Sequence, residues 1–152
     1  MERKLYEQNR LDTTSLACLI EPQNLGAGVT NSIWLGVQHY DKFMFVIMGG
    51  DCANIGDTLD AHVEQATTTG GAGGKDITGK AITQVTSTAT DQNMIWYIHV
   101  YIDELDVDAY YDSVRLVLDV SANDTWYIAA FCLREQRVVE EAPVTSVTEI
   151  IG

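Results

Sequence analysis

The sequence predicts an all-β fold, a two-sheet antiparallel β-sandwich of jelly-roll type with about eight strands. Apolar residues come in short bursts separated by turn residues, and β-branched and aromatic residues fill these bursts. Within the bursts, apolar and polar positions alternate, as they do in strands with one side in the core and one side in water. Extended arms are expected at both ends of this sandwich.

Eight apolar bursts are the candidate strands, in the order of the chain. They are residues 15–20, 33–37, 43–48, 58–66, 81–87, 94–102, 113–120 and 125–133. The stretches between them have turn or loop composition at residues 49–51, 67–79, 91–93 and 122–124. Pro22 and Pro143 fall outside the bursts, as expected because proline cannot donate to a strand ladder.

Alternation assigns faces to individual strands. In residues 94–102 it predicts a core-facing set, Met94, Trp96, Ile98, Val100 and Ile102, and a half-polar set, Ile95, Tyr97, His99 and Tyr101. In residues 113–120 the core-facing set is Val114, Leu116, Leu118 and Val120, and the outward set is Ser113, Arg115, Val117 and Asp119. Residues 58–66 also fit helical spacing, but their alternation favours a strand, which we predict.

The 152 residues and their composition suit one domain with a hydrophobic core. We divide the chain into an N-terminal arm (1–14), a β-sandwich domain (15–141) and a C-terminal tail (142–152). The arm and the tail lack a strand pattern but contain apolar residues. We therefore predict partner contacts at Leu5, Tyr6, Ile150 and Ile151.

Charge and hydropathy limit the classes of partner, and the cysteine content indicates the state of the thiols. Nine Lys and Arg against 22 Asp and Glu give a net charge of −13, which repels nucleic-acid phosphates, so direct nucleic-acid binding is not expected. The sequence contains no membrane-spanning run and no secretory signal at its start, so we expect cytosolic synthesis and no membrane contact. Cys18, Cys52 and Cys132 are expected to be reduced and mostly buried.

Two segments match the sequence patterns of known ligand sites only in part. Residues 74–81 nearly match the phosphate-binding loop G-x-x-x-x-G-K-[ST], but Ala81 replaces the hydroxyl residue that would hold magnesium. We predict instead a flexible glycine-rich loop over residues 67–76. The acidic run 103–108 lacks the glycine and the closing glutamate of a calcium loop, and a polar connection between strands is predicted. If calcium binds there, Asp103, Asp106 and Asp108 are the candidate ligands.

No catalytic constellation is complete in the sequence. His39, His62 and His99 are isolated, without metal-ligand spacing, and are interpreted as surface or structural residues. No nucleophile turn or activated cysteine setting occurs. We therefore predict no catalytic residue, no cofactor and no enzymatic activity. A carbohydrate-binding β-sandwich module is an alternative if aromatic residues form a solvent-facing row, such as Tyr97, Tyr101 and Trp126.

Three sequence segments follow one another along the chain: YDKFMFVIMGG, TLDAHVEQATTTGGAGGKDITGKAITQVT and DELDVDAYYDSVRLVLDV. This order resembles a group of small tailed-bacteriophage proteins encoded among head genes, over about residues 33–121. The resemblance implies a non-enzymatic virion protein, a capsid decoration or cement protein that binds the major capsid protein lattice and stabilises the head. It also implies a homotrimer on the capsid surface, with assembly in the host cytoplasm. A head-to-tail connector or tail component is the alternative within the virion.

Overall fold

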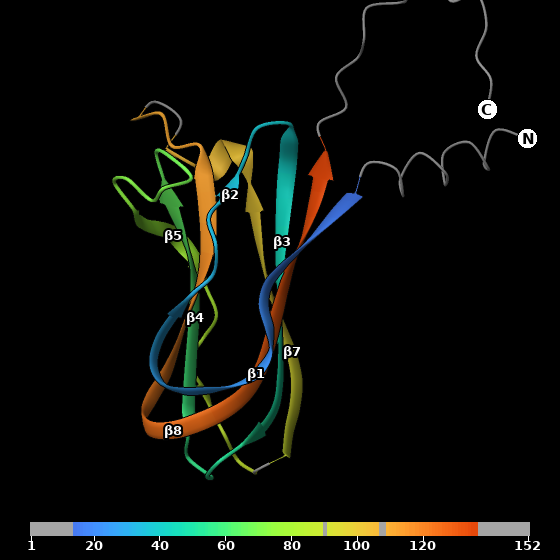
Figure 1. The fold of residues 1–152 in the computed structure, drawn as a ribbon, viewed down its shortest axis with the longest axis vertical. Coiled ribbons are helices and arrows are strands. Elements are labelled where there is room, and N and C mark those ends of the chain that lie inside the picture. Colours follow the sequence, from blue (N-terminus) through green and yellow to red (C-terminus); the bar gives the residue numbers. More distant parts are fainter. Residues whose placement is uncertain (1–13, 90, 107–108, 137–152) are drawn as a thin grey trace, which may run out of the picture.

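The computed structural model describes residues 14–89, 91–106 and 109–136, and it confirms the all-β fold (Figure 1). The paired strands are antiparallel: β1 (Thr14–Asn31), β2 (Leu35–Gly36), β3 (Tyr40–Cys52), β4 (Thr58–Ala66), β5 (Lys75–Ala81), β6 (Val85–Thr86), β7 (Asp91–Tyr101) and β8 (Ser113–Gln136). A single-turn 3-10 helix, η1 (Ile102–Glu104), follows β7. In the described ranges, no helix is long and apolar enough to cross a membrane.

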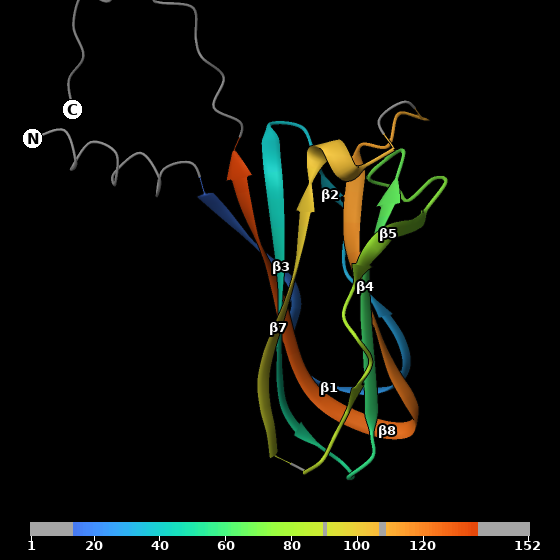
Figure 2. The same ribbon diagram turned by 180° about the vertical axis from the view of Figure 1, so that it is seen from behind.

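Two long strands fold the hydrogen-bonded sheet into two layers (Figures 1 and 2). The sheet order is β5-β4-β8-β3-β7. The first half of β8 pairs with β4 and its second half with β3, while β1 pairs with both halves of β8. Layer A therefore contains the start of β1, the end of β8, β3 and β7. Layer B contains the start of β8, β4, β5 and β6, with the end of β1 and the short β2.

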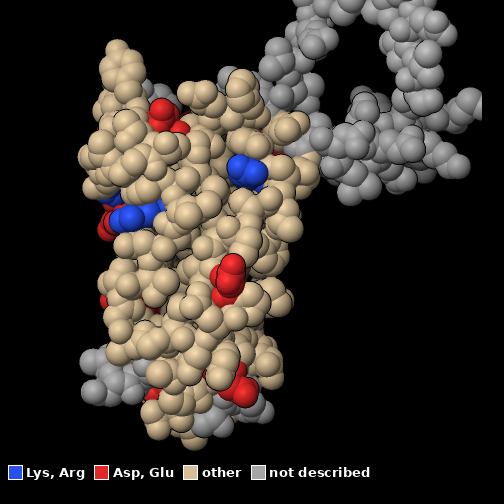
Figure 3. Space-filling model, viewed as in Figure 1, with Lys and Arg blue, Asp and Glu red and all other residues tan. Residues whose placement is uncertain are grey.

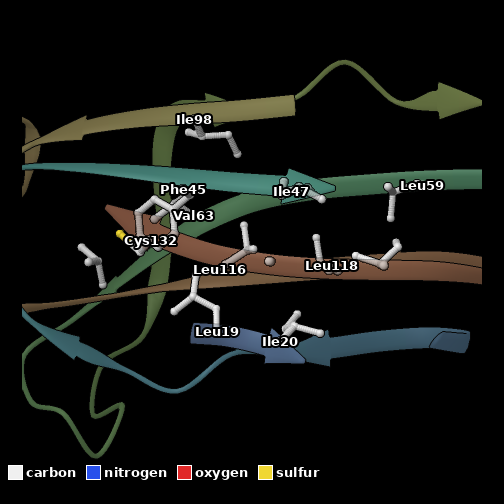
Figure 4. Close-up of a cluster of buried hydrophobic side chains, with 14 of the residues drawn as sticks. Leu19, Ile20, Phe45, Ile47, Leu59, Val63, Ile98, Leu116, Leu118 and Cys132 are labelled. Carbon is white, nitrogen blue, oxygen red and sulfur yellow. The ribbon is translucent and has the colours of Figure 1, made fainter. Parts of the chain in front are cut away.

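The core lies between the layers and is filled by the inward residues of both. The four residues predicted to face inward on 113–120 are all at most 1% exposed. They share one cluster with Phe43, Phe45 and Ile47 of β3 and with Leu59 and Val63 of β4, part of which is drawn in Figure 4. Burial of each large apolar side chain of this kind stabilises the fold by about 1.5–3 kcal/mol.

Residues 58–66 form a strand, as predicted. β4 buries Leu59, Ala61 and Val63, and it pairs with β8 on one side and with β5 and β6 on the other. Ladder partners on both sides satisfy its backbone groups in the extended conformation. Local helical spacing cannot compete with this pairing, because the periodicity of a short segment does not include the free energy of neighbouring strands.

Several predicted breaks lie inside continuous strands. Residues 113–120 and 125–133 belong to one strand, β8, whose backbone runs through the predicted turn at 122–124. Residues 49–51 are a bulge in β3, where the register with β7 and β8 shifts. β1 extends far beyond residues 15–20 and includes Pro22, which lies at a register shift between Ile20 and Gln23. A bulge tolerates proline because the ladder is interrupted there.

Some predicted strand bounds and some predicted side-chain faces are wrong, because they depend on neighbouring strands. β5 begins at Lys75, inside the stretch predicted as loop, and residues 81–87 contribute only the two-residue β6. Ser113 and Val117, predicted outward, are buried: strands flank β8 at both positions and their side chains are short, whereas Asp119, flanked in the same way, is exposed as predicted. Met94, predicted inward, is 44% exposed, since it lies near the start of β7, beyond the packed Trp96.

Candidate interaction surface

The outer side of layer A is apolar across four adjacent strands. In one row of the register, Leu16 of β1 lies beside Leu133 of β8, which lies beside Met44 of β3. The next rows place Cys18, Phe131, Val46 and Tyr97 side by side, and then Ala129, Met48 and Ile95. We call these residues the apolar face: Leu16, Cys18, Met44, Val46, Met48, Ile95, Tyr97, Ala129, Phe131 and Leu133.

Solvent reaches much of this face in the single chain. Leu16, Ile95 and Tyr97 are 66%, 62% and 63% exposed, and Met48 is 43% exposed. Scattered exposed apolar residues are ordinary, but a contiguous set spanning several strands is typical of a surface that contacts another molecule. The apolar face is therefore the strongest candidate binding surface in the described part of the chain.

Two charged side chains, Lys42 and Glu135, lie at one border of the apolar face. Lys42 and Glu135 are neighbours across β3 and β8, one row beyond Met44 and Leu133. The Lys42 ammonium lies 5.3 Å from the centroid of the Tyr101 ring, within cation–π range. A shallow hollow of about 180 Å³ lies at this border. In the view of Figure 3, blue and red atoms meet beside β5.

β7 ends the sheet order next to the apolar face. It pairs with β3 and, among the described strands, with no other. An edge strand presents backbone N–H and C=O groups on which a second chain can add a strand. Ile95 and Tyr97 on this strand thus combine exposed apolar side chains with an open backbone edge. His99, on the same side, has a lowered pKa because burial and then the nearby Lys42 and Lys80 disfavour its charge.

The outer side of layer B is polar and held by ion pairs. Glu64 of β4 accepts a 2.6 Å hydrogen bond from Arg115 Nε of β8. The guanidinium of Arg115 stacks 4.5 Å from the centroid of the Trp34 ring. Asp76 Oδ1 of β5 lies 3.3 Å from His62 Nε2. His62 was predicted to be an isolated histidine, but in the fold it lies between the carboxylates of Glu64 and Asp76.

The glycine-rich loop, residues 67–74, is closed by its own hydrogen bonds. Thr67 donates its backbone N–H and its hydroxyl to the carbonyl of Ala72, and Tyr111 donates its hydroxyl to the Gly73 carbonyl. The Trp34 ring covers Gly71, where a Cβ atom would come within 2.5 Å of the indole nitrogen. Strand β5 follows the loop, so no helix N-terminus is available here to receive a phosphate.

Two of the three candidate calcium ligands, Asp103 and Asp106, lie in the described part of the chain. Asp106 Oδ2 is 2.7 Å from Lys75 Nζ, which raises the pKa of Lys75 through their hydrogen bond, while Asp103 lies in η1. Burial disfavours the charge of Glu104, but bonds from Lys80 and the Tyr101 N–H outweigh this and hold its pKa below the usual range. Asp108 lies outside the described residues, as do the predicted partner contacts Leu5, Tyr6, Ile150 and Ile151.

The predicted row of exposed aromatics is only partly present. Tyr97 and Tyr101 are exposed, but Trp126 is fully buried. Trp126 packs edge-to-face on Trp96 at 6.3 Å between centroids and donates its ring N–H to the Gly50 carbonyl at 3.1 Å. Its place at the β3 bulge makes Trp126 a core residue, because a buried indole needs both apolar contacts and one acceptor.

The cysteines agree with the expectation of free, mostly buried thiols. Cys52 and Cys132 are buried, Cys18 is exposed, and all three are free. Burial raises the pKa of the Cys132 thiol to about 12. A thiol with so high a pKa is a weak nucleophile at neutral pH.

Comparisons with known proteins extend these observations at the level of the fold. No protein-family model matches the sequence, and neither does any curated protein. A chain from the structure of infectious bursal disease virus, Gx strain, superposes with a TM-score of 0.59 and 12% identity, over 84% of this chain and 33% of that chain. A chain from the T13 particle of the same virus gives 0.53 and 9%, over 82% and 32%.

The smaller SPBc2 prophage-derived protein YomS is similar over 79% of this chain and 92% of its own, with a TM-score of 0.46 and 10% identity. The chain described above spans about a third of the length of the viral chains it matches. What this chain shares with the chains of the bursal disease virus particle is the antiparallel β-sandwich fold.

Proposed function

We propose that this protein is a non-enzymatic structural component of a virion and that its copies associate through the apolar face. The observation that carries the proposal is the contiguous apolar face itself, with Leu16, Met48, Ile95 and Tyr97 open to solvent in the single chain. The fold shared with chains of a virus particle supports a structural role. The hollows in the described part are shallow and open, which suits contact better than catalysis.

The net charge of the chain restricts self-association to a surface that carries few charged groups, and the apolar face is such a surface. With a net charge of −13, two copies repel each other wherever carboxylates meet. The apolar face lets copies approach with few charged groups at the contact. Raising the salt concentration from 10 mM to 150 mM should therefore strengthen association, because screening reduces the repulsion and leaves apolar contact intact. Weaker association at higher salt would instead indicate an interface of ion pairs.

The finer proposal is a capsid decoration or cement protein of a tailed bacteriophage. Homotrimers would sit on the capsid surface, and Leu5, Tyr6, Ile150 and Ile151 in the terminal extensions would reach the major capsid protein. Lattice symmetry supports this arrangement, since many weak contacts repeated over a shell sum to strong attachment. Assembly would take place in the host cytoplasm.

Sedimentation of the purified protein tests the association. Wild type should be trimeric, Tyr97→Glu should be monomeric at the same concentration, and Val29→Glu should remain trimeric. Val29 is a matched control, because it is 61% exposed on β1 but lies outside the apolar face. A monomeric wild type at every concentration, or a trimeric Tyr97→Glu, would contradict the proposed interface.

Cosedimentation with heads that lack the protein tests the capsid role. Deletion of residues 1–13 should reduce binding to heads while leaving the circular dichroism of the domain unchanged, since β1 begins at Thr14. Full binding by the truncated protein would contradict the proposed contribution of the N-terminal arm to head binding. Copy number in purified particles separates the alternatives: hundreds indicate decoration, and roughly six to twelve indicate a ring-shaped connector or tail component.

A carbohydrate-binding module remains the alternative outside the virion. Tyr97 and Tyr101 lie on one side of β7, but the loss of Trp126 to the core leaves a narrower aromatic platform. Titration of tryptophan and tyrosine fluorescence with polysaccharides should show no saturable change. A saturable change that is lost in Tyr97→Ala would favour the alternative.

A further inference from the structure

We propose that His62, Glu64 and Asp76 form a binding site for Zn²⁺ on the outer side of layer B. The three residues each offer one ligand atom, and these atoms all lie within 4.8 Å of one another. The His62 Nε2 atom is 3.3 Å from Asp76 Oδ1 and 3.9 Å from Glu64 Oε1. This proposal is independent of the apolar face, which lies on the other layer.

The strand geometry brings the three side chains together. His62 and Glu64 are two residues apart on β4, so their side chains leave the same side of the strand. Asp76 of β5 is the register partner of Glu64, and the register shifts between His62 and Glu64, where Ala81 pairs with His62. The irregularity lets the exposed Asp76 reach the imidazole without disturbing the ladder beside it.

The distances suit a small tetrahedral ion. Zinc binds imidazole nitrogen and carboxylate oxygen at about 2.0–2.2 Å, which places ligand atoms roughly 3.3–3.5 Å apart in a tetrahedron. The contact between His62 and Asp76 already has this length, and the contact to Glu64 is within half an ångström of it. The third separation, between the ligand oxygens of Glu64 and Asp76, is at most 4.8 Å, and the Asp76 side chain, which is 73% exposed, can adjust its rotamer to shorten it.

Neighbouring side chains hold Glu64 in position. Its Oε2 atom accepts the 2.6 Å bond from Arg115, whose guanidinium stacks on the Trp34 ring, and its Oε1 atom remains turned toward His62. A ligating carboxylate is commonly fixed by an outer partner in this way. Arg115 also places a positive charge beside the site, which weakens cation binding without preventing it.

The donor set selects the class of metal. One imidazole nitrogen with two carboxylates suits a first-row divalent ion such as Zn²⁺, whereas Ca²⁺ and Mg²⁺ prefer sites made entirely of oxygen ligands. Three protein ligands leave a fourth tetrahedral position for water or for a group from a neighbouring molecule. The ion would link β4 to β5 at one end of the sheet order.

Isothermal titration of the full chain with ZnCl2 tests the site. One Zn²⁺ should bind per chain, and His62→Ala and Asp76→Asn should each weaken binding at least tenfold. Asp60→Asn is the matched control, because Asp60 lies on the same side of β4 and outside the ligand set, and it should bind as wild type does. Asp76→Asn is isosteric at an exposed position, so loss of binding there cannot be ascribed to misfolding.

Two further measurements test whether binding occurs at this site and whether it is specific for this class of metal. Co²⁺ in place of Zn²⁺ should give the visible absorption of a four-coordinate site, and this absorption should disappear in His62→Ala. MgCl2 and CaCl2 at the same concentration should give no saturable heat. Absence of Zn²⁺ binding, or binding that both variants retain, overturns the proposal. Sedimentation in EDTA measures the apolar interface separately, so failure of one proposal does not imply failure of the other.

Discussion

Replacement of Gly49 by alanine should destabilise the protein, whereas the same change at Gly50 should not. A Cβ atom at Gly49 would lie 2.7 and 2.9 Å from two ring carbons of Trp96 and 3.4 Å from the ring nitrogen of Trp126. The Trp96 ring cannot easily move, because it packs edge-to-face on Trp126 at 6.3 Å between centroids. At Gly50 the nearest atom to an added Cβ is 3.6 Å away, an ordinary contact.

The magnitude follows from two opposing effects. Overpacking of a filled core costs about 1–3 kcal/mol. Replacing glycine by alanine gains about 0.4–1 kcal/mol, since it restricts the unfolded chain wherever the backbone accepts a side chain. Neither Gly49 nor Gly50 has a positive φ. Gly49→Ala should therefore lose about 1.3 kcal/mol, within a range of about 0–2.6 kcal/mol, and Gly50→Ala should be neutral or gain up to about 1 kcal/mol.

Urea unfolding followed by tryptophan fluorescence measures both variants, because the two tryptophans at the bulge report on their own packing. Thermal unfolding gives a second reading, in which 1 kcal/mol corresponds to about 2–4 °C for a chain of this length. If Gly49→Ala is as stable as Gly50→Ala, Trp96 does not pack against the bulge of β3, and the packing argument is refuted.

Three further predictions concern titration, thiol access and the glycine-rich loop. The pKa of Glu104 in the folded protein lies below its value of about 4.5 in the unfolded chain. The ionised carboxylate therefore stabilises the fold above pH 4.5, and this stabilisation is lost as the pH falls through the folded pKa. In thermal unfolding from pH 6 to pH 3, Glu104→Gln should lose less stability than wild type. In the monomeric Tyr97→Glu variant, a thiol reagent at pH 8 should modify Cys18 quickly and Cys52 and Cys132 slowly, with all three reacting in denaturant; equal rates in the folded variant would contradict the burial of Cys52 and Cys132. Trp34→Ala should speed hydrogen exchange of the loop amides without changing exchange in β3, and unchanged loop exchange would show that the indole does not hold the loop.

The alternation of apolar and polar residues predicts which side chains face the core in strands that pack against the other layer on one side only. Leu116 and Leu118 are buried as their spacing required, and the choice of a strand for residues 58–66 was correct. The breaks were harder to predict, because turn composition is a local property and strand pairing is not. Residues 49–51 form a bulge since β7 and β8 hold β3 on both sides of it.

The candidate surfaces depend on register, which a single sequence does not contain. Tyr97 was correctly placed outward, but nothing in its own strand shows that Phe131 and Leu16 belong to the same surface. The spacing of His62 and Glu64 on one side of a strand was a usable signal for paired ligands. Their partner Asp76 could not be found, because its segment was predicted to be loop.

One strand fixes the two candidate surfaces relative to each other. β8 contributes Arg115 to the outer side of layer B and Phe131 to the outer side of layer A, and it remains a single strand between them. β1 follows β8 through the bend, since it pairs with β8 on both sides of it. Copies joined through the apolar face would therefore all carry the polar side of layer B outward in the same orientation, available to a different partner.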